Sequence, residues 1–367
     1  MRIKKIIKSI LRKTSMVLRT TSDIAYKDAQ NILTSYLETP IATCVGNNIL
    51  APQYDLQIVV PAYNAEKYIE ECLNSALCQK TEFSYIVTVV NDGSTDSTGE
   101  IIERICSKNR DKIEVINQNN RGFSGARNAG LQILKGRYIT FLDSDDMLAD
   151  GAVQVLMETA IDRNSKRFVA DIVQGSWITG TKLNGGRIQH ATELSGFPWG
   201  KIYRAELFEH FQFPEGYWFE DTPISFILYG CNLKTKVIDN AVYMYRVNPK
   251  GITATAPKSR RSVETYYITA LCLREIPRFG VQYDQRAYEY FLNQCVMNEL
   301  RIKHRPRKIR EAVFVLEADL KRQYFPKNKI WLEEKDRKQC IYLRDIEHAL
   351  EGRMFSRFEL LARTKEY

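Results

Sequence analysis

The sequence predicts an α/β protein, with a mostly parallel sheet that has helices on both faces and an α-helical region after it. The first observation is that short apolar runs alternate with helical patterns, which is typical of parallel sheets. The second is that a polar loop follows each run: LQIVV (56–60) precedes PAYN, YIVTVV (85–90) precedes NDGSTD, IEVI (113–116) precedes NQNNRG, and YITFL (138–142) precedes DSDD. Ligands bind outside the carboxyl ends of such strands, so we expect the four loops to meet at one edge.

The first 22 residues carry seven Lys/Arg and no acidic residue. The apolar side chains follow helical spacing and the basic ones fall mainly elsewhere on the helix: Ile3, Ile6, Ile7, Ile10, Val17 and Leu18 against Arg2, Lys5, Lys8, Arg12 and Arg19. This pattern predicts a basic amphipathic helix. Two alternatives stay open, because the helix could lie on an anionic membrane surface or pack on the rest of the protein or a partner.

Helices are predicted between the strands and at the end of the chain. Two of them have clear apolar faces, formed by Ile69, Cys72, Leu73, Ala76 and Leu77 and by Ile101, Ile102, Ile105 and Cys106. Residues 168–250 hold mixed, aromatic-rich segments, and from about Ser259 the pattern is helical, with a stop at Pro277 and further helices near 285–303 and 309–323. The predicted domains are a basic N-terminal extension (1–53), the sheet domain (54–255) and an α-helical region (256–367).

The composition is globular, with 44% hydrophobic and 26% charged residues. The net charge of +9 leaves nucleic acid, an anionic membrane and a phosphorylated substrate open as partners. The basic run RIKHRPRKIR (301–310) has no aromatic interleaving or known motif, so we expect no nucleic-acid partner. The eight cysteines lack metal-type spacing, and there is no apolar stretch of about 18 residues or secretory signal, so we expect a cytoplasmic protein with reduced thiols.

Three carboxylates, Asp143, Asp145 and Asp146, stand within four positions where the strand YITFL ends. Like charges raise the pKa of one another when they are partly buried, so a cation is expected nearby. A D-x-D pair suits Mg²⁺ or Mn²⁺, with waters and substrate phosphates as the other ligands. The alternative is a solvated turn in which an aspartate caps the next helix. No GxxxxGK[ST] is present and no GxGxxG follows the first strand, which excludes a P-loop and argues against a dinucleotide oxidoreductase.

Seven elements occur in a defined order. Four are VVPAYNAEKYIEECLNSAL, VVNDGSTDSTGEII, NQNNRGFSGARNAGL and GRYITFLDSDDML, and three follow downstream: WGKIY (199–203), Phe219-Glu220-Asp221 and Tyr245-Arg246. Together these elements resemble the family 2 glycosyltransferases of the GT-A fold. The resemblance covers residues 54–255. It implies an inverting, metal-dependent enzyme that moves a hexosyl or N-acetylhexosaminyl group from a nucleotide-diphosphate sugar, foremost a UDP-sugar. The implied acceptor is a hydroxyl of a glycan, a lipid-linked saccharide or a cell-envelope polymer, and the basic start of the chain suggests an enzyme peripheral on the inner face of the cytoplasmic membrane.

The resemblance also implies roles for individual residues in donor binding. The nucleotide and donor residues would be Pro61, Tyr63, Asp92, Arg127, Asp143 and Ser144, and Asp145 would bind the metal. Three of them have structural alternatives. Tyr63 could be a packed loop aromatic, Asp92 could form an Asx-turn, and Arg127 could make a surface ion pair.

The element Phe219-Glu220-Asp221 would supply the general base, because the resemblance implies that Asp221 takes the proton from the acceptor hydroxyl. The alternative is that Asp221 caps the helix beginning at Thr222-Pro223. The acceptor or sugar pocket would hold Trp199, Glu220 and Lys250, although Trp199 could equally be a core residue.

Two departures from the family pattern stand out. MYRVNPKGITAT (244–255) lacks the histidine that serves many relatives as an extra metal ligand, so Lys250 or Thr253 could contact the diphosphate instead. Asn91 replaces a frequent aspartate before Asp92. The competing function is a catalytically silent subunit that binds a nucleotide sugar or polymer. A nucleotidyltransferase is disfavoured because PAYNAEKY offers no Gly-rich loop with a basic residue.

Overall fold

The structure is a computed structural model that describes residues 21–162, 165, 167–181, 186–249, 251–330 and 337–364. The chain divides into two compact units, one at 40–251 and one that combines the residues before 40 with those from 252 onward. The sheet unit thus begins before the predicted boundary at 54 and ends before 255. The predicted amphipathic helix at 1–22 lies almost wholly outside the described residues, as does Lys250.

The first half of the sheet consists of four parallel strands in the order β3-β2-β1-β4. They are β1 (Ile49–Ala62), β2 (Tyr85–Asp92), β3 (Ile113–Gln118) and β4 (Ile133–Phe141). Each predicted strand is present, but β1 starts earlier than the apolar run LQIVV because its first residues pair with the start of β4 (Ile49 with Ile133). That extra part is largely exposed, so it lacks the apolar signal of a buried strand.

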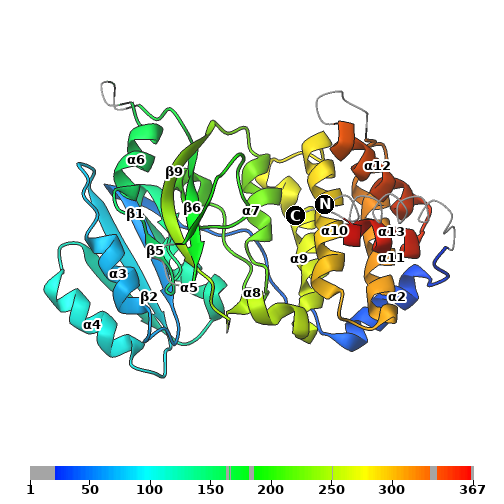
Figure 1. The fold of residues 1–367 in the computed structure, drawn as a ribbon, viewed down its shortest axis with the longest axis horizontal. Coiled ribbons are helices and arrows are strands. Elements are labelled where there is room, and N and C mark those ends of the chain that lie inside the picture. The colour runs from blue at the N-terminus through cyan, green and yellow to red at the C-terminus, as the bar shows by residue number, and fades with distance from the viewer. Residues whose placement is uncertain are drawn as a thin grey trace. The chain divides into compact units, whose positions relative to one another are not determined.

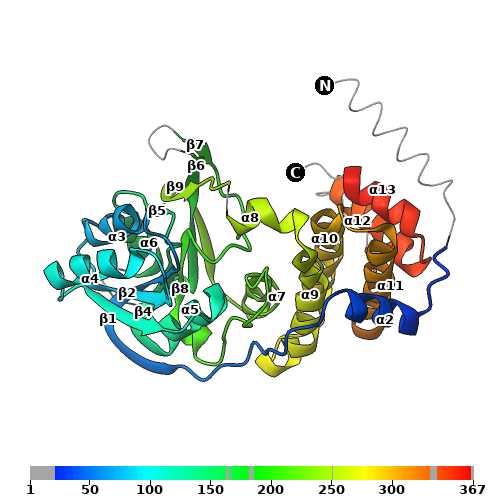
Figure 2. The ribbon, with the colours of Figure 1, turned by 90° about the horizontal axis from the view of Figure 1, so that it is seen from below.

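Helices cover both faces of these strands, as the alternation predicts (Figures 1 and 2). Ile58 and Val60 point to the face that carries α3 (Ile69–Leu77) and α4 (Thr98–Lys108). Val59 points to α5 (Gly122–Leu131) on the other face, where a Cβ added to Gly130 would lie 2.4 Å from Val59 Cγ1. This glycine therefore lets α5 approach the sheet closely.

The second half of the sheet is mixed and continues in the order β4-β8-β6-β9-β5, with β7 beside β6. Its elements are β5 (Met147–Leu148), α6 (Ala152–Ala160), β6 (Ile172–Gly180), β7 (Arg187–Gln189), β8 (Lys201–Arg204), η1 (Ala205–Phe208), α7 (Thr222–Phe226), η2 (Leu228–Gly230) and β9 (Thr235–Arg246). The pairing of Met147 with Met244 brings the end of β9 beside the turn at 143–146. The sequence predicted only mixed segments here, and this half supplies several groups of the site.

The second unit is helical, which confirms the expected α-helical C-terminal region. It contains α2 (Tyr26–Tyr36), α8 (Ile252–Thr255), η3 (Ala256–Lys258), η4 (Arg260–Val263), α9 (Glu264–Glu275), η5 (Ile276–Phe279), α10 (Gln285–Ile302), α11 (Arg307–Tyr324), α12 (Arg337–Glu351) and α13 (Phe355–Thr364). The α-helix α9 ends two residues before Pro277, as predicted. No helix among the described residues is long and apolar enough to cross a membrane.

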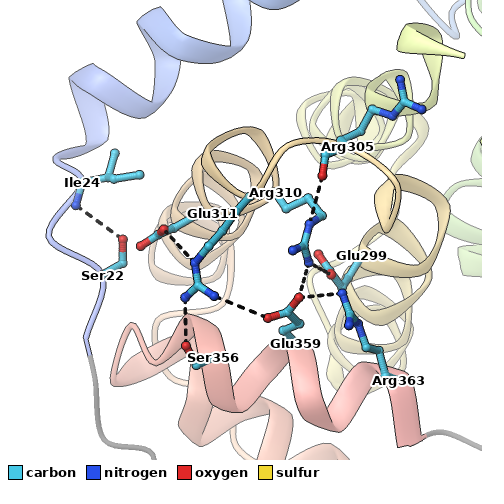
Figure 3. Close-up of polar contacts among 10 residues, drawn as sticks. Ser22, Ile24, Glu299, Arg305, Arg310, Glu311, Ser356, Glu359 and Arg363 are labelled. Carbon is cyan, nitrogen blue, oxygen red and sulfur yellow. Dashed lines mark hydrogen bonds and ion pairs between the residues drawn. The ribbon is translucent and has the colours of Figure 1, made fainter.

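Several cations of the basic run at 301–310 are engaged inside this unit (Figure 3). Arg310 donates to Glu299 at 2.7 Å and also pairs with Glu359. Arg307 donates to Ser356 Oγ at 3.0 Å. These residues join α10, α11 and α13, so this part of the positive charge has a structural role.

A buried polar network lies in the core of the helical unit around Glu317 on α11. Asn298 donates to Glu317 Oε1 at 2.8 Å and accepts from Thr265 Oγ1 at 2.6 Å. The other carboxylate oxygen, Oε2, is buried and has no hydrogen-bond partner. Burial raises the pKa of Glu317 well above its ordinary value, because an ionised carboxylate loses its hydration there.

The change Glu317→Gln is expected to make the stability of the protein less sensitive to rising pH. The raised pKa means that Glu317 is protonated when folded and ionised when unfolded above pH 4.5, so its contribution to stability falls as the pH rises. The amide removes that loss, and we expect it to raise stability by about 1–3 kcal/mol at pH 8 with little change near pH 4.5. Thermal unfolding across this pH range measures the difference.

Glu289→Gln is the matched control, because the same substitution then falls on an exposed position of α10. Burial raises the pKa of Glu299 to about 7, so Glu299 also makes stability fall as the pH rises. This contribution should persist in both variants. A stability that falls with pH as steeply in Glu317→Gln as in the control would contradict the assignment.

Candidate functional site at the carboxyl edge of the sheet

Asp92 is the last residue of β2 and is only 1% exposed. Its Oδ1 accepts hydrogen bonds from Gln118 Nε2 at 2.6 Å and from the Arg121 backbone N–H at 2.9 Å. Its Oδ2 is buried and has no partner. A buried carboxylate oxygen without a donor is costly, so this atom points to a donor group on a ligand.

The loop after β1 is tied to the loop after β2. Asn64 has a left-handed backbone (φ 47°), its Oδ1 accepts from the Thr95 N–H at 2.8 Å, and its own N–H donates to Ser94 Oγ at 3.2 Å. Asn91 Oδ1 in turn accepts from the Ser94 N–H at 3.2 Å. Beside these contacts Pro61 is buried, whereas Tyr63 is 50% exposed and so differs from a packed loop aromatic.

Arg127 on α5 joins two of the predicted site segments. Its Nη2 donates to Asp143 Oδ1 at 2.9 Å, and its Nη1 forms an ion pair with Glu220 Oε1. Only 4% of Arg127 is exposed, so these ion pairs are buried and differ from the surface pair considered from the sequence. Burial opposes the charge, but the carboxylates of Asp143 and Glu220 outweigh it and raise the pKa of the guanidinium.

The segment before α7 brings Glu220 to this edge, and Asp221 follows it in the chain. Phe219 adopts a left-handed backbone (φ 64°), which is unfavourable for a bulky residue and is typical of functional sites. Asp221 occupies the N-cap position of α7, but its side chain makes no capping hydrogen bond. Burial raises the pKa of Glu220 to about 7, against the opposing effect of Arg127.

The aspartates of the turn after β4 have different surroundings. Asp146 is 1% exposed and accepts from Tyr243 O–H at 2.8 Å and from the Arg246 N–H at 2.7 Å. Burial and then the charge of Asp143 raise the pKa of Asp146 to about 8. Asp145 is partly exposed, its Oδ2 accepts from Asn248 Nδ2 at 3.1 Å, and burial raises its pKa.

Three residues at or just after the end of β9 therefore hold the acidic turn, and no sequence pattern predicted this role: Tyr243, Arg246 and Asn248. Arg246 also donates from Nε to the Asp145 carbonyl at 2.8 Å and pairs with Glu71 at 2.5 Å. The Tyr-Arg element was visible in the sequence, but only the pairing of β9 with β5 shows what it contacts. Asn248 lies in the segment 244–255, which lacks the histidine that serves many relatives as an extra metal ligand.

The donor chemistry of this turn suits a divalent cation that brings most of its own ligands. No group of three or more His, Cys, Asp or Glu side chains in the described parts of the chain could hold a metal ion. Asp143 and Asp146 are already engaged by Arg127 and Tyr243, which leaves Asp145 as the protein carboxylate for a metal. A single carboxylate completed by phosphate oxygens and waters is a usual Mg²⁺ arrangement.

The other predicted site residues are placed as follows. Ser144 is half-buried in the acidic turn, and Trp199 is 6% exposed, with its ring stacked on Tyr243 at a centroid distance of 4.5 Å. Lys250 lies outside the described residues. The edge thus combines groups from the turns after β1, β2 and β4, from α5, from the end of β9 and from the segment before α7 (Figures 1 and 2 show the elements).

Comparison with known proteins identifies the same region of the chain. Residues 57–219 match the family model described as glycosyl transferase family 2. Glycosyltransferase GlyA of Streptococcus pneumoniae serotype 4 is 31% identical over 52% of this chain and 30% of its own length. The uncharacterized glycosyltransferase EpsJ of Bacillus subtilis is 33% identical over 54% of this chain and 62% of its own length. The chain therefore spans less than two thirds of either relative.

A similar fold is found among solved structures. The crystal structure of S. aureus TarS 1–349 in complex with UDP-GlcNAc superposes with a TM-score of 0.62, covering 84% of this chain and 90% of the TarS fragment. The sequence identity is 22%, so this likeness concerns the fold.

The change Arg127→Met is expected to destabilise the sheet unit by about 3–5 kcal/mol, because it leaves Glu220 buried without its cation. Adding Glu220→Gln should recover part of that loss, since the amide carries no charge. Denaturant unfolding of the two variants measures both effects. Arg121→Met is the control, because Arg121 pairs with Glu215 at an exposed position and should cost about 0–1 kcal/mol. Equal losses of stability in Arg127→Met and Arg121→Met would show that the buried ion pairs of Arg127 contribute no more to stability than an exposed pair.

Proposed function

This chain belongs, through residues 57–219, to family 2 of the glycosyltransferases with the GT-A fold, and from that premise we propose that it transfers a sugar from a UDP-sugar to a hydroxyl group of a glycan acceptor. The transferred group is a hexosyl or N-acetylhexosaminyl unit. The acceptor is a saccharide of the cell envelope, either lipid-linked or polymeric, which agrees with the basic amphipathic sequence of residues 1–22.

The observation that carries this proposal is the convergence of the acidic turn and the Glu220-Asp221 segment on one buried arginine. Arg127 contacts Asp143 on one side and Glu220 on the other. A donor diphosphate at the turn and an acceptor hydroxyl at Asp221 would then be held by one rigid framework. Positioning of two reactants in this way lowers the entropic part of the barrier.

The donor end is formed by Asp92 and Tyr63. The partnerless Oδ2 of Asp92 accepts the N–H of a uracil ring, and the exposed ring of Tyr63 offers a stacking surface next to Pro61. Asp143 and Ser144 bind the ribose hydroxyls. The TarS fragment that shares this fold was solved with UDP-GlcNAc, which supports UDP as the nucleotide.

Asp145 would hold a divalent cation, Mn²⁺ or Mg²⁺, together with the donor diphosphate. When bound, the cation stabilises the negative charge that develops on the departing UDP. Asn248 orients the carboxylate of Asp145, and Arg246 holds the backbone of the turn from the Asp145 carbonyl. Tyr243 and the Arg246 N–H fix Asp146, which therefore shapes the turn instead of contacting the donor.

Asp221 is the general base of a single displacement. The acceptor oxygen forms its bond to the anomeric carbon while the bond from that carbon to the diphosphate oxygen breaks, which inverts the configuration. Asp221 takes the proton of the acceptor hydroxyl. Asp221 occupies the N-cap position of α7 without a side-chain capping bond, and the left-handed Phe219 lies two residues before it.

A thermal-shift screen of UDP-, GDP- and dTDP-sugars, each with and without Mn²⁺, tests the donor. A UDP-sugar with Mn²⁺ is expected to stabilise the protein by about 2.7 kcal/mol at a hundred-fold excess over its Kd, and the other nucleotides by less. Asp145→Asn should abolish the effect of Mn²⁺. Stabilisation that is equal for all three nucleotides, or none at all, would refute the proposed donor.

The change Asp221→Asn is expected to lower transfer about 10²- to 10⁴-fold, because the amide cannot accept the proton. Release of UDP from the best donor, in the presence of a panel of cell-envelope glycans, measures the rate. The shift caused by the UDP-sugar should stay as in the unmodified protein. Asp239→Asn, an exposed position on β9, is the control. A transfer rate that survives in Asp221→Asn would rule out this base. An unmodified protein that binds the UDP-sugar but transfers nothing would favour a catalytically silent binding subunit.

A further inference from the structure

A continuous stack of aromatic rings runs from the acidic turn to the surface of the sheet unit. Phe197 lies on Trp199 with a centroid distance of 4.7 Å and ring planes 2° apart. Trp199 lies on Tyr243 at 4.5 Å and 12°. Trp177 on β6 meets Phe197 and Trp199 edge-on, at 6.2 and 5.7 Å. The four rings form one packed body, which we call the aromatic stack.

The inner end of the aromatic stack is part of the acidic turn. The Tyr243 hydroxyl donates to Asp146 Oδ2 at 2.8 Å and accepts from the Asp143 N–H at 3.1 Å. The position of Trp199 is therefore fixed relative to the proposed donor-binding residues. Only 6% of Trp199 is exposed. Trp199 supports the stack from inside and offers little surface to a ligand.

The outer end is Phe197, which is 42% exposed. Its loop is held in place by buried polar side chains. Ser195 N–H donates to Gln174 Oε1 at 2.8 Å, and Lys201 Nζ donates to the Ser195 carbonyl at 2.6 Å. Tyr203 O–H donates to the Pro198 carbonyl at 3.1 Å. An aromatic ring that stays exposed on a fixed loop is pre-organised for binding.

The same loop is connected to the segment of the proposed base. Tyr229, in η2 shortly after α7, donates to the Ser195 carbonyl at 2.7 Å and accepts from Lys201 at 3.0 Å. Burial lowers the pKa of Lys201, and Asp221 is the charged group that opposes this effect. Phe197 thus belongs to a loop linked on one side to the acidic turn and on the other to η2, which follows α7.

We propose that Phe197 is the platform for the acceptor, stacking on the apolar face of a pyranose ring whose hydroxyl group is delivered to the catalytic edge. This inference rests on the proposed function and adds the residue that selects a saccharide as acceptor. A pyranose ring matches the surface because Phe197 is a single exposed aromatic ring on a segment that also carries exposed polar residues, Thr192 and Glu193. Protein partners usually require contiguous apolar patches of several hundred Å².

The test is a glycan array of bacterial cell-envelope saccharides, probed with the labelled full chain in the presence of UDP and Mn²⁺. The unmodified protein is expected to bind at least one saccharide. Phe197→Ala should weaken that binding at least ten-fold, and Phe197→Tyr should retain it, because the phenol keeps the ring. Ile133→Ala is the control, since Ile133 is 43% exposed at the opposite end of the parallel strands.

The thermal shift caused by UDP and Mn²⁺ is measured on the same variants. It should be unchanged in Phe197→Ala, which separates loss of acceptor binding from a damaged fold. The inference is overturned if no saccharide binds, if Phe197→Ala binds as the unmodified protein does, or if it loses the UDP shift in parallel. A protein that responds to UDP but binds no saccharide would refute the platform alone, whereas one that ignores every nucleotide would refute the proposed function.

Discussion

The ion pairs of Arg127 are the interaction on which the rest of the site depends. Removing a guanidinium from water is costly and is offset only when carboxylates surround it closely. Asp143 and Glu220, which are far apart in the sequence, provide that compensation. In return they are fixed in place, and with them the turn that would bind the donor and the segment that would activate the acceptor. One buried cation thereby sets the geometry of both halves of the proposed reaction.

The crowding of three aspartates after β4 is resolved by giving each a different partner. Asp143 has the charge of Arg127, and Asp146 has a tyrosine hydroxyl and a backbone N–H. Asp145 keeps a partly exposed carboxylate with one amide contact, and it is the one suited to a cation that arrives with a nucleotide. The aromatic stack extends this arrangement outward, because Tyr243 belongs to both the turn and the stack.

Local patterns predicted the parallel half of the fold well, since apolar runs, helical spacing and polar loops are determined by neighbouring residues. The strands at 85–92 and 113–118 begin at the predicted residues, and α10 at 285–302 nearly matches its predicted range. The mixed half was missed because β6, β8 and β9 pair over long separations. For the same reason the pair Arg127–Glu220 and the contact of Asn248 with Asp145 had no signal in the sequence, although their residue types suited the site.

The central claim is that one rim of the sheet binds both the uracil ring and the diphosphate of the donor. A crystal structure of the full chain with UDP and Mn²⁺ would test it most directly. The account predicts a uracil N–H about 2.7–3.2 Å from Asp92 Oδ2, the one oxygen of that side chain without a partner, and the metal on Asp145 with Arg127 still paired to Asp143 and Glu220. A nucleotide bound away from this rim, with Asp92 Oδ2 still lacking a donor, would contradict it.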